Sequence, residues 1–284
     1  MARILALSSQ VARGHVGLSA IVPALQALDH EVIALPTVLL SNHPGHAHVA
    51  GERVSPDMLR KMLDALEKNG WLGEVDAVLT GYLPSVEHVM FASYALERVR
   101  SANPRAVFHC DPIIGDAPEG IYIAREAAEA IRDQLLPEAD VVKLNHFELE
   151  WLTGGSWTAS KLVHQPAPKL GLGMSLVTSV AEPSDAQILN IALLGDHRLT
   201  CSVDRRTDVP KGTGDLFSGL LLGYRLNGDD WPTAIGKTVA LLDRVIASSI
   251  HHDALRCAAV FGRGIADVRP FPVSAHEHQI PGAG

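Results

Sequence analysis

Short apolar runs alternate with helical segments along the first two thirds of this 284-residue chain. The runs have the length and composition of buried strands at 3–7, 31–35, 77–80, 106–110, 141–144 and 175–180. Between them, apolar residues recur with helical spacing at 18–28, 55–69, 85–101, 124–136 and 146–152. The alternation predicts βαβ units, and therefore an α/β fold with a mostly parallel sheet and helices on both of its faces.

The last third of the chain follows a different pattern. Two apolar runs, 188–194 and 197–203, flank Gly195-Asp196, which predicts an antiparallel hairpin. Three helices are expected after the hairpin, at 213–226, at 232–250 and, more briefly, near 253–260. This part of the chain therefore adds an antiparallel pair and a helical layer to the parallel sheet.

Two segments lack a regular pattern. The stretch 36–51 is irregular and precedes a helix that Ser55 caps, with Pro56 at its first position. We expect this stretch to form a short lid-like segment. The Pro- and His-rich tail from about Arg269 is expected to be loose. With 47% apolar residues the chain can bury a large core, and we expect a single domain over 1–284.

Composition excludes several classes of function. The net charge of −8 argues against binding a nucleic-acid backbone. The three cysteines include no CxxC pair, so reduced thiols and a cytoplasmic location are expected. No apolar stretch approaches the roughly 18 residues of a membrane span, so we expect no membrane partner. The histidines at 43, 46 and 48 lack a known zinc-ligand spacing, and a mobile polar lid is the favoured interpretation.

The segment 209–219 carries the strongest chemical signal. Gly212, Thr213 and Gly214 stand just before Asp215, and an apolar helical run follows. Glycines bend the backbone tightly, and a helix start offers free N–H donors, so the segment suits a phosphate. A carboxylate repels phosphate, but an enzyme would keep Asp215 there to accept the proton of an attacking hydroxyl. Phosphoryl transfer to an alcohol is therefore predicted; a plain Gly-rich loop with an N-capping acid is the alternative.

Polar residues follow successive strands, and parallel sheets bind ligands beyond the carboxyl ends of their strands. The candidates for one shared cleft are Ser9, His43, Tyr82, Asp111, Asn145, Glu148, Thr178 and Asp215. Asp111 and Glu148 fit Mg²⁺, which is usually held by one or two carboxylates plus phosphates. Plainer explanations stay open for single residues, because Asp111 before a proline is ordinary turn chemistry and Asn145 with Glu148 is also a capping box.

Taken together, these motifs resemble those of the pyridoxal kinases of the ribokinase-like superfamily, which implies a three-layer α/β/α sandwich. The resemblance covers nearly the whole chain and is weakest at 155–173 and after His251. The motifs that carry it are SQVARGHVG (9–17), SNH (41–43), GY (81–82), CDPIIGD (110–116), NHFE (145–148) and GTGD (212–215). The last two mark the superfamily, whereas the first loop, SNH and CDP point more narrowly to pyridoxal kinase.

The resemblance implies a vitamer site. Asp215 would be the general base on the 5′-hydroxyl of pyridoxal, with Gly212, Thr213 and Gly214 as the anion hole for the transferred phosphate. Ser9 would hydrogen-bond the pyridine ring. The remaining residues implied to line the vitamer pocket are Val16, His43, Pro44 and Tyr82.

The resemblance also implies ATP as phosphate donor and Mg²⁺ as its cation. Asp111 and Glu148 would face the nucleotide phosphates and the metal, and Asn145 would order the same turn. Thr178, Gly212 and Gly214 would lie near the phosphates, and 200–203 near the adenine. A homodimer is implied as well.

The chain departs from the family pattern at three places. Pro44 stands where a threonine is common, Lys143-Leu144 where a small residue and a proline are common, and His15 where tyrosine is common. Lys143 could add a charge near the phosphates or point to solvent. Two alternatives therefore stay open: a hydroxymethylpyrimidine or sugar kinase of the same superfamily, and a non-catalytic vitamer-binding protein. The first loop, without the Gly-Ser-Asp and Gly-Gly runs of the pyrimidine kinases, argues against the first.

Overall fold

The computed structural model describes residues 1–166, 168, 170–181, 186–262, 264–265 and 268–277. Within these residues, ten strands form one sheet in the order β12-β11-β10-β9-β8-β5-β4-β1-β2-β3. The strands are β1 (Arg3–Val11), β2 (Glu31–Leu40), β3 (Gly51–Arg53), β4 (Ala77–Thr80), β5 (Val107–Cys110), β8 (Val141–Asn145), β9 (Met174–Val180), β10 (Gln187–Leu194), β11 (His197–Asp204) and β12 (Ser274–Glu277). The six adjacent strands β9, β8, β5, β4, β1 and β2 are all parallel, which confirms the expected mostly parallel sheet.

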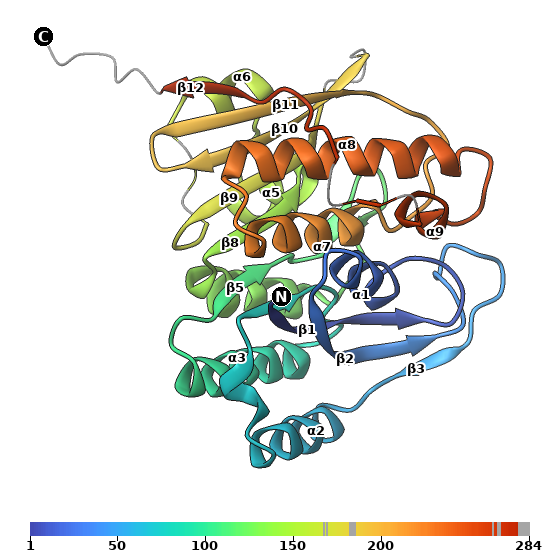
Figure 1. The fold of residues 1–284 in the computed structure, drawn as a ribbon, viewed down its shortest axis with the longest axis vertical. Helices are drawn as coiled ribbons and strands as arrows, with labels where there is room; N and C mark the ends of the chain where they lie inside the picture. The colour runs from blue at the N-terminus through green and yellow to red at the C-terminus, as the bar shows by residue number, and fades with distance from the viewer. Residues whose placement is uncertain (167, 169, 182–185, 263, 266–267, 278–284) are drawn as a thin grey trace, which may run out of the picture.

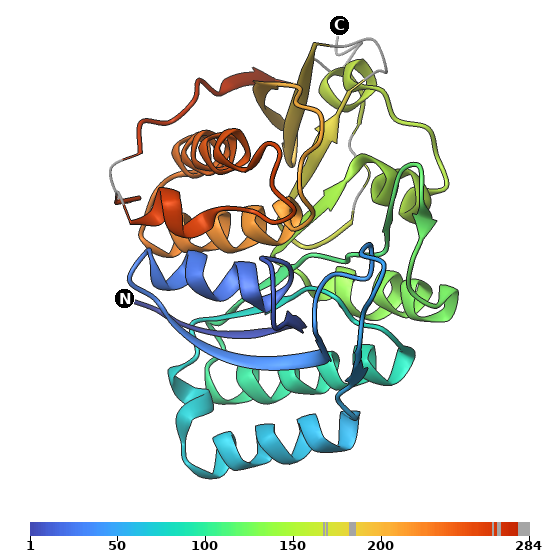
Figure 2. The ribbon, with the colours of Figure 1, turned by 90° about the vertical axis from the view of Figure 1, so that its right-hand side faces the viewer.

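Helices cover both faces of the sheet (Figures 1 and 2). One layer holds α1 (Leu18–Gln26), α7 (Thr213–Leu226), α8 (Trp231–Ser249) and α9 (Cys257–Phe261). The other layer holds α2 (Pro56–Lys68), α3 (Val86–Ala102), α4 (Arg125–Ala130), α5 (His146–Thr153) and α6 (Ala159–His164). The result is the three-layer α/β/α sandwich that the sequence predicts. Among the described residues, no helix combines the length and the apolar character needed to cross a lipid bilayer.

The first two strands are longer than the sequence predicts. Residues 8–11 and 36–40, expected as loop and lid, continue β1 and β2 and pair with each other as far as Val11 and Leu40. Two polar residues of these stretches have partners in the backbone of Tyr82, which donates its N–H to Ser8 Oγ at 3.0 Å and accepts from Thr37 Oγ1 at 2.7 Å. The irregular segment between β2 and β3 is therefore confined to 41–50.

The antiparallel hairpin β10–β11 is confirmed, with Gln187 opposite Asp204. The prediction of a loose tail is wrong for its last described part, because β12 pairs antiparallel with β11 and adds an edge strand. The tail is ordered there because β11 would otherwise leave the backbone N–H and C=O groups of its outer edge unpaired, and β12 pairs with them. Residues 278–284 of that tail lie outside the described part. The structure also contains α6 and a small hairpin, β6 (Gly115–Asp116) with β7 (Gly120–Ile121), which the sequence analysis did not predict.

The register of the parallel strands brings their carboxyl ends to one edge. Leu7 pairs with Thr80, Thr80 with Cys110, and Cys110 with Val142. The residues that follow these positions, including Asp111, therefore emerge side by side at the edge where a doubly wound sheet binds its ligands.

Candidate active site

Sheet register brings Asp111 and Lys143 together. Since Cys110 pairs with Val142, the next residue of each chain segment lies beside the other. Cys110 and Val142 pack into the core on the α3 side, so the alternation of side chains turns Asp111 and Lys143 to the α7 side. There Lys143 Nζ is 2.7 Å from Asp111 Oδ2, and the two side chains are only 4% and 2% exposed. The expectation that Lys143 could point to solvent is wrong.

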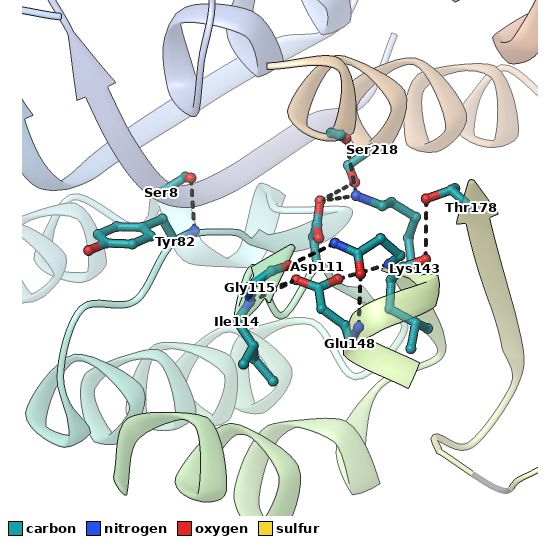
Figure 3. A network of polar contacts seen from close by, with 12 residues as sticks. Ser8, Tyr82, Asp111, Ile114, Gly115, Lys143, Glu148, Thr178 and Ser218 are labelled. Atoms are coloured by element: carbon teal, nitrogen blue, oxygen red, sulfur yellow. Dashed lines mark hydrogen bonds and ion pairs between the residues drawn. The ribbon is translucent and has the colours of Figure 1, made fainter. Parts of the chain in front are cut away.

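Two further groups from α7 complete the surroundings of this ion pair (Figure 3). Ser218 Oγ donates a hydrogen bond to Asp111 Oδ2 at 2.7 Å, and Lys143 Nζ donates to the carbonyl of Gly214 at 3.3 Å. Asp111 Oδ1 is buried and has no partner among the described residues. The sequence analysis did not single out Ser218, although its place three residues after Asp215 on a helix puts both on one face.

The beginning of α7, the predicted phosphate cradle, depends on a glycine. Gly212 has φ 105°, a conformation that favours glycine, and the helix begins at Thr213. A Cβ on Gly212 would overlap the backbone carbonyl of His15, so the close approach of the first loop depends on this glycine. The first turn of α7 lies close to Asp111, since Lys143 contacts both Asp111 and the Gly214 carbonyl. The free N–H groups of a first helical turn are suited to an anion.

Asp215 lies in the first turn of α7 and is partly buried, with its Oδ1 inaccessible and without a partner among the described residues. Burial, reinforced by the nearby charge of Asp111, raises the pKa of Asp215 to about 6. Backbone hydrogen bonding from Gly17 and the positive charge of Lys143 act in the opposite direction. A carboxylate with this pKa is largely ionised at neutral pH and is a better base than an exposed aspartate.

Glu148 organises the loop beyond β5. Its Oε1 accepts the N–H of Ile114 at 2.8 Å and that of Gly115 at 3.5 Å. Its Oε2 accepts the N–H of Asn145 at 2.8 Å, and the Asn145 side chain accepts the N–H of Glu148 at 2.8 Å. The capping-box interpretation is thereby confirmed. Burial and the charge of Asp111 raise the pKa of Glu148 to about 7.

Asn145 and Thr178 stand beside each other across β8 and β9. Asn145 Nδ2 donates to the Gly115 carbonyl at 2.8 Å, which links the capping box to the small hairpin. Thr178 is buried and its Oγ1 donates to the Leu144 carbonyl at 3.3 Å. Thr178 lies at the same edge as Asp111 and Glu148 (Figure 3), and Asn145 lies there too, since it pairs with Thr178 and shares the capping box with Glu148.

The predicted vitamer residues divide into two sets. Val16 and His43 line one cavity of about 280 Å³, together with His15, Lys211 and other residues of neighbouring loops. Burial, and then the charge of Lys211, lowers the pKa of His43, so this imidazole is neutral at physiological pH. The cavity therefore combines an apolar side chain with neutral and charged nitrogen groups, and lies where the first loop approaches Gly212.

Ser9, Pro44 and Tyr82 are not among the residues that line this cavity. Ser9 lies beside Gly17, where a Cβ on the glycine would overlap Ser9 Oγ. Tyr82 is partly buried and its backbone bridges Ser8 and Thr37, whereas Pro44 is exposed. Their predicted contacts with the vitamer stay predictions.

The carboxylates fit a metal that arrives with other ligands. Within the described residues, no group of three or more His, Cys, Asp or Glu side chains is arranged to hold a metal ion. Both oxygens of Glu148 are occupied by backbone N–H groups, and Asp111 Oδ2 by Lys143 and Ser218. Of the four oxygens of Asp111 and Glu148, Asp111 Oδ1 is the one without a partner in the described part of the chain. One free oxygen suits Mg²⁺ that keeps its waters and phosphate ligands.

Comparisons with known proteins agree with this geometry. A family model described as phosphomethylpyrimidine kinase matches residues 14–257. A pyridoxal kinase of Leifsonia xyli is 34% identical over 253 residues, which are 87% of this chain and 89% of that protein. Human pyridoxal kinase is 31% identical over 291 residues, covering 95% of this chain and 90% of its own. The structure of pyridoxal kinase from Leishmania donovani in complex with ADP and pyridoxine superposes with a TM-score of 0.87 at 27% identity, covering 96% and 98% of the two chains.

The fold and the motifs at its ligand-binding edge are those of a kinase of the ribokinase-like superfamily. The motifs GTGD and NHFE lie at the beginnings of α7 and α5, where the sequence resemblance requires them. The chain belongs to the pyridoxal kinase family.

Proposed function

We propose that the protein is an ATP-dependent pyridoxal kinase that phosphorylates the 5′-hydroxyl of pyridoxal. Pyridoxine and pyridoxamine are further candidate acceptors. The observation that carries the proposal is Asp215, a carboxylate with a pKa raised to about 6, in the first turn of a helix that Gly212 caps and that begins at Thr213. Membership of the pyridoxal kinase family, with relatives covered over most of their length, supports the same acceptor.

In the proposed reaction the 5′-oxygen of the vitamer attacks the γ-phosphorus of ATP. A bond forms between these two atoms, the bond from the γ-phosphorus to the β,γ-bridging oxygen breaks, and ADP leaves. Asp215 accepts the proton of the hydroxyl and later returns it to water. The N–H groups of 212–214 stabilise the charge on the transferred phosphoryl group, whose transition state needs positioning and charge stabilisation more than covalent help.

Mg²⁺ is proposed as the cation of the nucleotide, and it would neutralise charge on the phosphate oxygens. Asp111 Oδ1, buried and without a partner among the described residues, is the best-supported contact toward this metal or its waters. Glu148 would act chiefly by holding the loop at Ile114 in place, since its own oxygens accept backbone N–H groups. Thr178 and Asn145 are proposed to lie near the nucleotide phosphates.

The adenine is proposed to lie against β11. Ser202 and Val203 line a cavity of about 240 Å³ with Asp243 and Phe271, and this hollow supports the proposal. The vitamer would occupy the cavity that Val16 and His43 line. The segment 41–50 would close over it, since lids of this kind exclude water from kinase sites. A homodimer in the cytoplasm is proposed by family resemblance, and sedimentation of the purified protein tests the dimer.

A hydroxymethylpyrimidine kinase is the second candidate. One observation favours it: the family model that matches 14–257 carries the description phosphomethylpyrimidine kinase. The two candidates share the fold, the anion hole and the base, and differ only in the acceptor ring. A non-catalytic vitamer-binding protein has less support, because Asp215 and the glycines of the anion hole are intact.

The test is ADP release from ATP and Mg²⁺ with pyridoxal, pyridoxine, pyridoxamine, hydroxymethylpyrimidine and ribose as separate acceptors. Turnover on a vitamer that Asp215→Asn abolishes, with nucleotide binding retained, is the expected result. Asp29→Asn, at an exposed turn whose φ of 63° suits asparagine, is the control and should keep full activity. Turnover only on the pyrimidine would select the second candidate. Vitamer binding without turnover on any acceptor would overturn the proposal that the protein is an enzyme.

A further inference from the structure

We propose that Lys143 is a built-in cation of the transfer site: a positioning residue whose ammonium group takes the place of a bound metal ion between Asp111 and the anion hole. The inference deepens the proposed function and rests on it. It concerns the residue at which the chain departs from the family pattern.

The position of the ammonium group is set from two sides. Lys143 Nζ donates to Asp111 Oδ2 at 2.7 Å and to the Gly214 carbonyl at 3.3 Å. Asp111 directly follows β5 and Gly214 lies in α7, so the two acceptors are far apart in the sequence. A carboxylate oxygen and a carbonyl oxygen are the ligands that a bare hard cation would choose. The ammonium therefore joins the phosphate cradle to the carboxylate edge as such an ion would.

The surroundings of Lys143 are strongly acidic. Besides Asp111, the carboxylates of Glu148 and Asp215 are close enough to favour its charged form. The side chain is 4% exposed, so solvent does not screen these charges effectively. His109, the other basic group influenced by Lys143, is buried and neutral, since burial lowers its pKa to about 3. The ammonium group of Lys143 therefore interacts with the carboxyl groups of Asp111, Glu148 and Asp215.

The ion pair of Lys143 and Asp111 offers a ligand one hydrogen-bond donor and one acceptor. Lys143 Nζ carries three N–H bonds, and the described residues accept two of them. Asp111 Oδ1 is buried and has no partner among the same residues. With Oδ2 taken by Lys143 and Ser218, Asp111 has one oxygen left for a cation. The arrangement accommodates the metal that accompanies the nucleotide and leaves no room on Asp111 for a second, permanently bound ion.

This role has a chemical consequence for the transfer step. A fixed charge beside the Gly214 carbonyl holds the first turn of α7 in place, and therefore the N–H groups that receive the phosphoryl group. Preorganised charges and dipoles of this kind need no rearrangement as charge develops in the transition state. Loss of Lys143 should consequently lower kcat more than it raises the KM for the vitamer.

Metal binding tests the proposal without any assay of activity. Mn²⁺ binding is followed by electron paramagnetic resonance of the free ion, with and without ADP. The unmodified protein should bind no stoichiometric Mn²⁺ up to on the order of 1 mM without nucleotide, and one Mn²⁺ per protein with ADP. A tight site in the nucleotide-free protein, or two Mn²⁺ ions in the ADP complex, would overturn the proposal.

Two variants of Lys143 form a matched pair. Lys143→Ala leaves space for a small cation, and Lys143→Met fills that space with an uncharged chain of similar length. Both should lower kcat on the order of 100-fold. Added methylammonium should raise the kcat of Lys143→Ala on the order of tenfold and leave the kcat of Lys143→Met unchanged. The control Lys68→Met, at the exposed end of α2, should behave as the unmodified protein throughout. Equal rescue of both variants, or of neither, would contradict a cation role.

The experiment separates this proposal from the proposed function. If the protein phosphorylates no vitamer but the pyrimidine, the same variants are assayed with that acceptor. If it turns over none of the acceptors, the Mn²⁺ measurement can still overturn the proposal, because it requires only the folded protein and ADP. Should either variant fail to fold, the result with the unmodified protein alone can overturn the inference.

Discussion

Gly212 and His15 approach each other so closely that the backbone carbonyl of His15 occupies the space a Cβ on Gly212 would need. Gly212 also has φ 105°, where side chains are disfavoured. We expect Gly212→Ala to abolish turnover, because the methyl group must push the first loop away from the phosphate cradle. Steady-state kinetics and thermal unfolding measure the effect.

Gly228 offers a matched control for this substitution. It has φ 93°, but no heavy atom of the described residues lies within 4 Å of the added Cβ. Gly228→Ala therefore adds backbone strain alone. It should lower the free energy of unfolding by about 1–2 kcal/mol and leave the activity unchanged. If both variants lose activity equally, backbone strain rather than the contact with His15 is responsible.

The pKa of Asp215 predicts how turnover depends on pH. A general base must be ionised, and burial raises the pKa of Asp215 to about 6. We expect kcat/KM to be level above this pH and to fall about tenfold per pH unit below it. Measured profiles with pyridoxal, corrected for titration of the vitamer and of ATP, test this. A profile that stays level down to about pH 4 would contradict the raised pKa, since an aspartate with its ordinary pKa would give that profile.

The same shift predicts a stability effect of known sign. The pKa of Asp215 is higher in the folded protein than its ordinary value of 3.8, so the folded state binds the proton more tightly. Folding is therefore favoured at low pH, and this contribution is lost as pH rises from about 4 to about 6. Asp215→Asn should raise Tm at about pH 8 and raise it much less at about pH 4.5. Asp29→Asn should show no such pH-dependent difference.

The sequence predicts those parts of the fold that depend on local pattern. The bounds of α7 agree with the expected 213–226, and α2 begins at Pro56 with Ser55 as its cap, as the residues indicate. The capping box of Asn145 and Glu148 follows equally from residue types three positions apart. In each case the interacting groups are close in the chain, so propensity and spacing contain the information.

Long-range pairing explains what local pattern does not predict. Ser8 and Thr37 look like loop residues, and only their hydrogen bonds to the backbone of Tyr82 make them acceptable within strands. The partner of Lys143 depends on the register of β5 against β8, a property of two segments more than thirty residues apart. Asp111, Asn145 and Thr178 lie at one edge because they stand at or near the carboxyl ends of neighbouring parallel strands. The vitamer side depends on loop conformation, which the sequence does not specify.

Ser218 provides a test of the network around Asp111. Its Oγ donates to Asp111 Oδ2 at 2.7 Å and is fully buried. Ser218→Ala removes a hydrogen bond to a charged acceptor, and we expect a loss of about 1.5–3 kcal/mol of unfolding free energy. Chemical denaturation measures it, with Ser101→Ala, at the exposed end of α3, as the neutral control. An unchanged midpoint would mean that Lys143 alone satisfies that oxygen.

The three cysteines give the last prediction. Cys110, Cys201 and Cys257 are free and buried, and burial raises their pKa values to about 12, about 11 and about 12. Reaction with iodoacetamide needs the thiolate and access to it, and the folded protein offers neither at neutral pH. We expect no alkylation and full activity after prolonged exposure of the native protein, and three alkylated cysteines after unfolding in guanidinium chloride. Mass spectrometry counts the adducts. Rapid modification of Cys110 in the native state would mean that the strand before Asp111 opens to solvent, which the buried ion pair with Lys143 should prevent.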